Sequence, residues 1–306
     1  IDRVDRANSP SLGLSNKASA ADKLEEAEGA EDRIDSASFE IIRLPLERDI
    51  GAVSLWPEAN KLIGHNTELY CLASWSSEER VLVASSCKAR TVEDAAIRLW
   101  DIQEQSCLQV LSGGHKSTVA TMSFSASGEY LASSGKDRRL CLWKKASDGL
   151  FNLAWAKDSA HKRIIWSVDW CGGILASGSR DGCVRIWKLQ DEELVEMYEL
   201  SPVTKVNLKP VSVAALSFAP PLSDSKTVLA LGLENGLIEL FSISLLPDID
   251  EPKCIWQLSS HQCHNCTISK LSWRPREPLD GVYQLASGSL DHGCRIFGIK
   301  LSDLNY

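Results

Sequence analysis

The sequence lacks the features that define several protein classes. Across 306 residues, no apolar run approaches the roughly 18–20 residues that span a bilayer, and no basic-then-apolar secretion signal opens the chain. Gly-x-Ser-x-Gly, His-Glu-x-x-His, phosphate-loop and dinucleotide-binding motifs are also absent. These absences disfavour a membrane protein and the common hydrolases and nucleotide-binding enzymes, and they make a cytoplasmic and nuclear location the default expectation.

Charge and cysteine content narrow the class further. The formal net charge is −8, and residues 1–50 carry much of it, with twelve acidic and seven basic residues. We expect residues 1–53 to be an acidic, largely irregular segment, and residues 15–38, rich in Ala, Glu, Asp and Ser, to form a mobile insertion or a frayed helix. The ten cysteines show no paired spacing, so we expect reduced thiols rather than a disulfide framework.

A repeat runs through the rest of the chain. Five times an acidic or amide residue stands six positions before an aromatic one: Asp94 and Trp100, Asp137 and Trp143, Asp181 and Trp187, Asn235 and Phe241, Asp291 and Phe297. A second set of aromatics keeps the same phase: Trp75, Phe124, Trp170, Phe218 and Trp273. Between the two sets lie short runs that alternate apolar and polar residues, separated by tight turns, which predicts antiparallel sheets.

Histidine and serine supply two more markers. His115, His161 and His264 each stand nine residues before the second-set aromatic, and His65 stands ten before it. Ser133, Ser177 and Ser287 each precede the turn acid by four residues, and Ser85 takes the same strand position despite a five-residue insertion. In the fourth unit Lys209 and Leu231 replace this pair.

These markers, with Gly64-His65, Gly114-His115 and Trp100-Asp101, resemble the WD-repeat β-propeller family over residues 54–306. The resemblance implies an all-β fold with five recognisable four-stranded blades at about residues 62–112, 113–158, 159–205, 206–259 and 260–306. Five blades are an unusual ring. We therefore expect upstream residues to complete a larger, seven-bladed ring, with closure of a small ring by residues 54–61 as the alternative.

In that family, His, Ser or Thr, Asp and Trp of one blade form a hydrogen-bonded chain, which we call the brace. The resemblance assigns braces to His65, Ser85, Asp94 and Trp100; to His115, Ser133, Asp137 and Trp143; to His161, Ser177, Asp181 and Trp187; and to His264, Ser287 and Asp291. The same trio of Ser, His and Asp in four units indicates scaffolding, because an active site is needed once. The fourth unit is expected to be held by apolar packing alone.

Other stretches, outside the repeat pattern, carry a narrower resemblance. Residues 12–18, 55–58, 87–89 and 163–170 resemble the propeller subunit of an assembly that modifies the wobble uridine of transfer RNAs. This resemblance implies a non-catalytic scaffold without a cofactor. Its expected partners are a large scaffold subunit and a catalytic acetyltransferase subunit that uses acetyl-CoA and an iron–sulfur centre. It also explains a first residue other than methionine as part of a longer protein.

Two groups of residues are candidate binding sites. His261, Cys263 and Cys266 have the spacing of a zinc knuckle, but His264 already belongs to a brace and no second Cys-x-x-Cys pair exists, so an ordinary loop is the favoured interpretation. A basic set could contact RNA phosphates and bases, or protein: Lys136, Arg138, Arg139, Lys162, Arg163, Trp166 and Arg180. A peptide-reading adaptor of another complex and a direct RNA-binding propeller are the alternative functions.

Overall fold

The computed structural model describes residues 61–78, 80–206, 209–220, 226–245, 251–258, 261–275 and 281–300. The expected irregular segments at residues 1–53 and 15–38 lie outside this set. By its internal contacts the chain divides after Ile63, and residues 64–306 form the unit described below. No helix among the described residues is long and apolar enough to cross a membrane.

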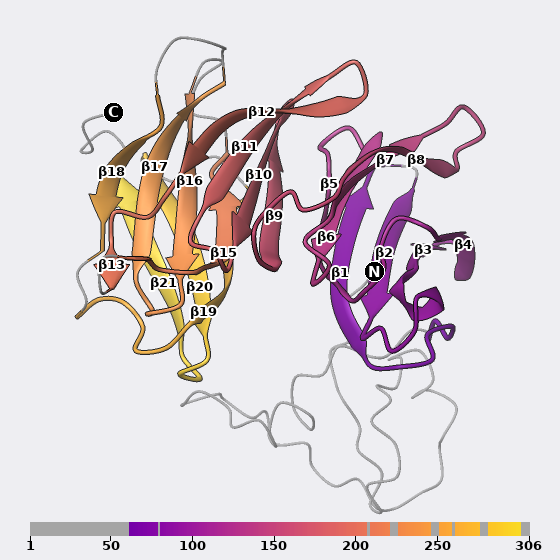
Figure 1. Ribbon diagram of the computed structural model, residues 1–306, viewed down its shortest axis with the longest axis horizontal. Helices are drawn as coiled ribbons and strands as arrows, with labels where there is room; N and C mark the ends of the chain where they lie inside the picture. The colour runs from indigo at the N-terminus through magenta and orange to yellow at the C-terminus, as the bar shows by residue number, and fades with distance from the viewer. Residues whose placement is uncertain are drawn as a thin grey trace, which may run out of the picture. The chain divides into compact units, whose positions relative to one another are not determined.

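The chain forms a series of antiparallel sheets, which we call blades (Figure 1). The first blade contains β1 (Leu69–Ser76), β2 (Val81–Cys87), β3 (Ile97–Asp101) and β4 (Ser106–Leu111). The second contains β5 (Val119–Phe124), β6 (Tyr130–Gly135), β7 (Leu140–Lys145) and β8 (Phe151–Lys157). The third contains β9 (Ile165–Cys171), β10 (Ile174–Ser179), β11 (Val184–Gln190) and β12 (Glu193–Leu200).

The later blades differ in their connections and in their strand number. The fourth contains β15 (Val213–Phe218), β16 (Lys226–Leu233), β17 (Ile238–Ser244) and β18 (Lys253–Gln257). The fifth contains β19 (Ile268–Trp273), β20 (Val282–Ser289) and β21 (Cys294–Lys300), three strands among the described residues. A hairpin of β13 (Lys205–Val206) and β14 (Lys209–Pro210) connects the third blade to the fourth, and the 3-10 helix η2 (Glu93–Ala95) lies between β2 and β3. The expected all-β fold is confirmed.

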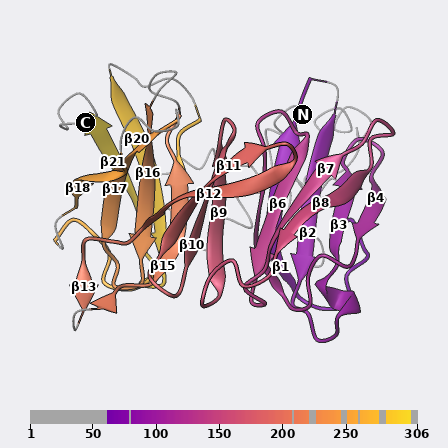
Figure 2. The ribbon, with the colours of Figure 1, turned by 45° about the horizontal axis from the view of Figure 1, so that its top comes forward.

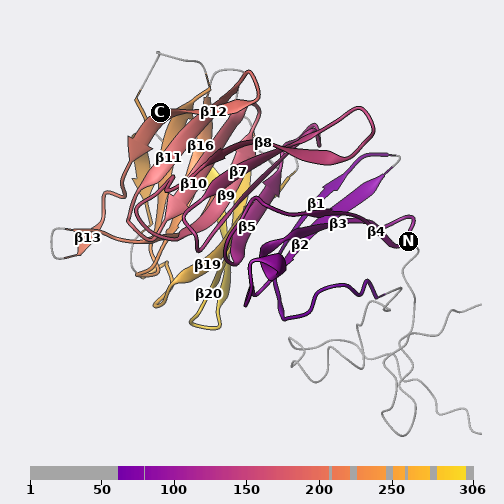
Figure 3. The same ribbon diagram turned by 45° about the vertical axis from the view of Figure 1, so that its right-hand side comes forward.

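The blades follow one another through their first strands. β1 lies beside β5, β5 beside β9, β9 beside β15, and β15 beside β19 (Figures 2 and 3). The three middle blades are thus each packed between their neighbours in sequence, as the repeat predicts.

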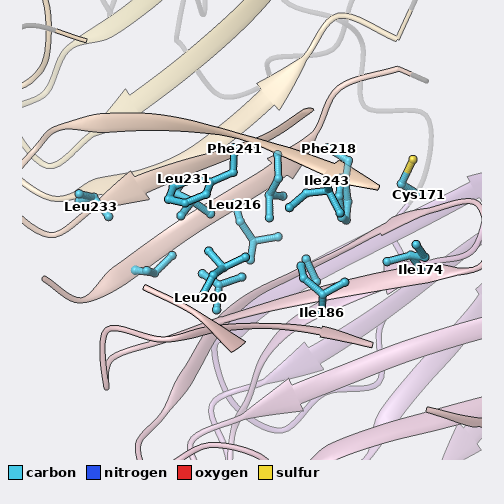
Figure 4. Close-up of a cluster of buried hydrophobic side chains, with 14 of the residues drawn as sticks. Cys171, Ile174, Ile186, Leu200, Leu216, Phe218, Leu231, Leu233, Phe241 and Ile243 are labelled. Carbon is cyan, nitrogen blue, oxygen red and sulfur yellow. The ribbon is translucent and has the colours of Figure 1, made fainter. Parts of the chain in front are cut away.

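Apolar side chains fill the space between blades. Between the third and fourth blades, Ile186 and Leu200 pack with Leu216, Phe218 and Phe241 (Figure 4). Burying a side chain of this size contributes about 1.5–3 kcal/mol, so these layers contribute strongly to the stability of the fold. The second set of aromatics also contributes hydrogen bonds between neighbouring blades.

Three tryptophans of that second set bond to the neighbouring blade. The indole N–H groups of Trp75, Trp170 and Trp273 donate to the carbonyl oxygens of Ala126, Ser123 and Ser217, at 3.0, 3.1 and 3.0 Å. A buried indole N–H needs such a partner, because leaving it unsatisfied is costly. The regular placement of these aromatics in the sequence therefore reflects contacts between blades.

The residue after each turn acid or amide has a left-handed backbone in the last four blades. Arg138, Gly182, Gly236 and His292 have φ of 65°, 76°, 87° and 64°. At Gly236 a Cβ would lie 2.2 Å from the carbonyl oxygen of His264, so only glycine fits this turn. Arg138 adopts the same conformation at a cost of about 1 kcal/mol, and its side chain is exposed.

Candidate functional site

The second blade contains a complete brace. The Nδ1 atom of His115 lies 3.0 Å from Oδ2 of Asp137, and its Nε2 atom lies 2.9 Å from Oγ of Ser133. The indole N–H of Trp143 donates to the same hydroxyl oxygen at 2.8 Å. The His115 side chain is fully buried, so its two ring nitrogens depend on these partners.

The Asp137 carboxylate also receives two backbone N–H groups. Lys116 N and Arg139 N donate to it at 3.0 and 3.1 Å. Burial opposes ionisation of this group, but the hydrogen bond and charge of His115 and the two amides outweigh burial, so the pKa of Asp137 lies below its ordinary value. The acid therefore joins the turn, the histidine loop and the strand.

The fifth blade repeats this geometry with one donor fewer. His264 is 3.0 Å from Asp291 through Nδ1 and 2.7 Å from Ser287 through Nε2. Backbone amides of Asn265 and Gly293 donate to Asp291, at 3.0 and 2.8 Å. These amides, with the Asn265 bond as the largest contribution, lower the pKa of Asp291 to about 2. Phe297 stands in the tryptophan position and gives Ser287 no indole donor.

The brace of the third blade is looser at the acid. His161 Nε2 and Trp187 Nε1 both lie 2.8 Å from Ser177 Oγ, but His161 Nδ1 is 3.4 Å from Asp181, the distance of an ion pair rather than a close hydrogen bond. Asp181 still accepts from Lys162 N and Cys183 N at 2.9 and 3.0 Å. Burial opposes ionisation of Asp181, but His161 and the two backbone amides outweigh it and hold the pKa of Asp181 well below its ordinary value.

The prediction that Asp94 joins the first brace is wrong. His65 Nε2 bonds Ser85 Oγ at 2.6 Å, and Trp100 Nε1 donates to the same oxygen at 2.6 Å. Among the described residues, the hydrogen bonds of the Asp94 carboxylate go instead to the loop of residues 90–91 and to Asn66, and His65 is not a partner. The five-residue insertion is the reason, because it places Asp94 in η2, away from the strand turn.

The expectation that apolar packing alone holds the fourth blade is also wrong. The side chain of Glu239 on β17 is fully buried and accepts four hydrogen bonds. The donors are Val203 N at 2.8 Å, Thr204 N at 2.8 Å, Thr204 Oγ1 at 2.6 Å and Gln257 Nε2 at 2.9 Å. A carboxylate therefore replaces the histidine brace in this blade.

Glu239 occupies a position that sequence reasoning missed, two residues before the brace aromatic. At this position Arg185 Nη1 donates to Ala160 O, Arg295 Nη1 donates to Gln262 O, both at 2.8 Å, and Cys141 Sγ lies 3.3 Å from Gly114 O. The carbonyls of Ala160 and Gly114 directly precede a brace histidine, and that of Gln262 lies two residues before one. The side chain at this position fixes the preceding loop. In the fourth blade the direction of the hydrogen bonds is reversed, because the Glu239 carboxylate accepts from loop N–H groups instead of donating to a loop carbonyl.

Backbone bonds bring the predicted basic loops together on the second and third blades. Ala160 N donates to Arg138 O at 2.9 Å, and Arg180 N donates to Ile164 O at 2.9 Å. The exposed side chains are Arg138, Lys162, Arg163 and Arg180, and none of them has an ion-pair partner among the residues that the structure describes. We call these four residues the basic surface. Trp166 is half-buried beside it.

Two predicted members of this set have structural contacts instead. The Lys136 ammonium lies 4.9 Å from the centroid of the Tyr70 ring, which joins the second blade to the first. Arg139 donates through Nη1 to Gly114 O at 2.6 Å and pairs through Nε with Asp158 at 3.1 Å. Arg139 is therefore part of the loop support rather than a free cation.

The repeats that form these blades match a known family model. The family model described as "WD domain, G-beta repeat" matches residues 56–101, 105–144, 156–188 and 252–298, more than half of the chain. The chain belongs to the WD-repeat family. The unmatched interval 189–251 includes the first three strands of the fourth blade, β15–β17, where Glu239 replaces the histidine brace.

Relatives that share one name align with almost the whole chain. It is 35 % identical over 348 residues to Elongator complex protein 2 of Danio rerio, covering 99 % of this chain and 42 % of the relative. It is 32 % and 31 % identical to proteins of the same name from Schizosaccharomyces pombe and Saccharomyces cerevisiae, covering 97 and 96 % of this chain and 38 and 37 % of theirs. The narrower resemblance of residues 12–18, 55–58, 87–89 and 163–170 is thereby confirmed. The chain spans about two fifths of these relatives' length.

A solved structure supports the WD-repeat fold alone. A chain in "Crystal Structure of Mitotic Checkpoint Complex" matches with a TM-score of 0.57 and 18 % identity, over 77 % of this chain and 63 % of that chain. At this identity the match concerns the arrangement of strands and carries no functional argument.

The zinc-knuckle pattern does not assemble a metal site in this WD-repeat unit. Cys263 is buried, with its Sγ atom 3.9 Å from Leu258 O, whereas His261 and Cys266 are exposed. Within the described ranges, no three His, Cys, Asp or Glu side chains are placed to hold a metal ion. All ten cysteines are free thiols. Cys141 is buried, but Cys294 is exposed, because it lies on β21, the outer strand of the three-stranded fifth blade.

Proposed function

We propose that this chain is a non-catalytic component of the Elongator complex that supports assembly of the machinery for tRNA wobble-uridine modification. The alignment of 96–99 % of the chain with proteins named Elongator complex protein 2 carries this proposal. The braces support a scaffold role, since their Ser, His and Asp residues bond to one another and to backbone groups within the blades. Rigid blades of this kind present their loops to partners. Chemistry then belongs to another subunit, and we propose cytoplasmic and nuclear localisation.

Purification of the tagged full-length protein tests this proposal. Quantitative mass spectrometry of the retained proteins should identify the large scaffold subunit and the catalytic acetyltransferase subunit in amounts comparable to the tagged protein. An unrelated WD-repeat protein with the same tag is the control. The proposal is wrong if the remaining subunits assemble normally in cells that lack this chain.

The basic surface supports a second role, direct contact with tRNA. Arg138, Arg163 and Arg180 are exposed beside the half-buried Trp166, an arrangement that suits phosphate contacts and stacking on a base. Replacing the three arginines by Ala should weaken tRNA binding and lower the slope of log affinity against log salt by about 2–3, since each lost phosphate contact removes about 0.7–0.9.

A variant with the same loss of charge is the control. Arg90, Lys253 and Lys300 are exposed and lie outside the basic surface, so their replacement by Ala should leave the salt slope unchanged. Binding would be measured by fluorescence anisotropy with labelled tRNA at several salt concentrations. Equal salt slopes for both variants would exclude this surface as the tRNA contact.

A further inference from the structure

The connection between the third and fourth blades differs from the other connections between blades. At the corresponding place the second, third and fifth blades carry a loop with a brace histidine, whereas here the chain forms the hairpin β13–β14. Lys205 pairs with Pro210 and Val206 with Lys209. We call residues 203–206 and 209–210 the connecting hairpin.

Both ends of the connecting hairpin are fixed to the blades. At its start, Glu239 accepts from the backbone of Val203 and Thr204 and from the Thr204 hydroxyl, and Gln257 donates to Glu239 beside them. At its end, Pro210 packs so closely on the turn of the third blade that a Cβ at Gly182 would lie 2.7 Å from it. A buried carboxylate is costly unless its hydrogen bonds are made, so the four donors to Glu239 hold the start of the hairpin in place.

The exposed side chains of the connecting hairpin are apolar or cationic, with Val206 and Lys209 paired across it. Val203 and Val206 are 54 % and 52 % exposed, and Lys205 and Lys209 are also exposed. Neither lysine has an ion-pair partner among the residues that the structure describes. Arg180, in the turn against which Pro210 packs, adds a third cation. The combination of two exposed valines with these cations suits a protein partner better than RNA, because valine offers neither hydrogen bonds nor a stacking face to a base.

We propose that the connecting hairpin is a docking surface for a segment of another Elongator subunit in which apolar side chains alternate with, or are flanked by, carboxylates. This proposal rests on the proposed function, because it requires the chain to be part of that complex. Val203 and Val206 would be covered by the apolar residues of the segment, and Lys205 and Lys209 would pair with its acids. The docking surface is separate from the braces, which lie within the second, third and fifth blades.

Site-specific photo-crosslinking within the purified complex tests this contact. A benzophenone amino acid replaces Val206 in the tagged full-length protein, and a second protein carries it at Leu153, an exposed residue on the outer strand β8. Position 206 should crosslink to another subunit within a segment rich in acidic and apolar residues, and position 153 should not reach that segment. Crosslinking of position 206 to RNA, to a basic segment, or no more strongly than position 153 would overturn the proposal.

Charge reversal provides the matched quantitative test. Lys205→Glu with Lys209→Glu should lower the crosslinking yield at position 206 by about tenfold or more, since both changes place like charges against the acids of the segment. Lys253→Glu with Lys300→Glu makes the same change in net charge elsewhere and should leave the yield unchanged. If the subunits copurify and both double variants crosslink like the wild type, the docking surface is wrong and the proposed function stands. If no subunit copurifies with the wild type, both are wrong.

Discussion

Replacement of Glu239 by Ala is expected to lower the free energy of unfolding by about 3 kcal/mol, the largest effect of any polar substitution in the fourth blade. The variant leaves the amides of Val203 and Thr204, the Thr204 hydroxyl and the Gln257 side chain without their common acceptor. It also opens a space where a fully buried side chain had been. Urea unfolding followed by tryptophan fluorescence measures the change.

Two variants separate the role of Glu239 from that of side-chain size. Glu239→Gln keeps one acceptor oxygen and places an NH₂ group against the remaining donors, so we expect a loss of about 1 kcal/mol. Arg185→Ala removes the equivalent support in the third blade, where the side chain donates to Ala160 O and pairs with Glu199 at the surface. If Glu239→Ala costs no more than Arg185→Ala, then the carboxylate is not the main support of the connecting hairpin.

The repeat markers predicted the blades well because each marker reports a local contact. An aromatic at a fixed distance from a turn acid indicates a strand, a tight turn and a return strand, and each of these depends on nearby residues. The braces of His115 and His264 are present as the resemblance to the WD-repeat family implied, because their residues keep the spacing of that family's markers. The sequence was therefore sufficient for the fold and for much of the second, third and fifth braces.

Asp94 and Glu239 show where this reasoning stops. Asp94 keeps its spacing to Trp100, but the insertion before it changes which backbone groups it meets, and spacing alone does not record that change. Glu239 breaks no repeat spacing, and its role depends on donors about 35 residues away along the chain. The signal that would have revealed it is the position two residues before the brace aromatic, where Arg98, Arg185 and Arg295 recur. An acid at a position where the other blades have Arg or Cys indicates that the partner has changed from acceptor to donor.

Replacement of Asp137 by Ala is the second prediction with a large effect, and Asp94→Ala is its matched control. Both acids stand six residues before a brace tryptophan, but only Asp137 contacts a buried histidine. The Asp137 variant leaves His115 Nδ1 and the amides of Lys116 and Arg139 without an acceptor, so we expect a loss of about 2–3 kcal/mol at pH 7. Asp94→Ala should cost much less, because its loop is exposed and water can replace the carboxylate.

The pH dependence of this difference distinguishes a charged brace from a purely steric one. The pKa of Asp137 is lower in the folded chain than its ordinary value, so the unfolded chain takes up the proton first on acidification. The stabilisation by Asp137 is therefore complete above about pH 4 and is lost as the pH falls further through the lowered pKa. The difference in urea midpoint between the wild type and Asp137→Ala should be smaller at pH 3 than at pH 7. A difference that stays constant over this range would mean that the Asp137 side chain acts by its size and hydrogen-bonding shape, and that its charge contributes nothing to holding the histidine loop.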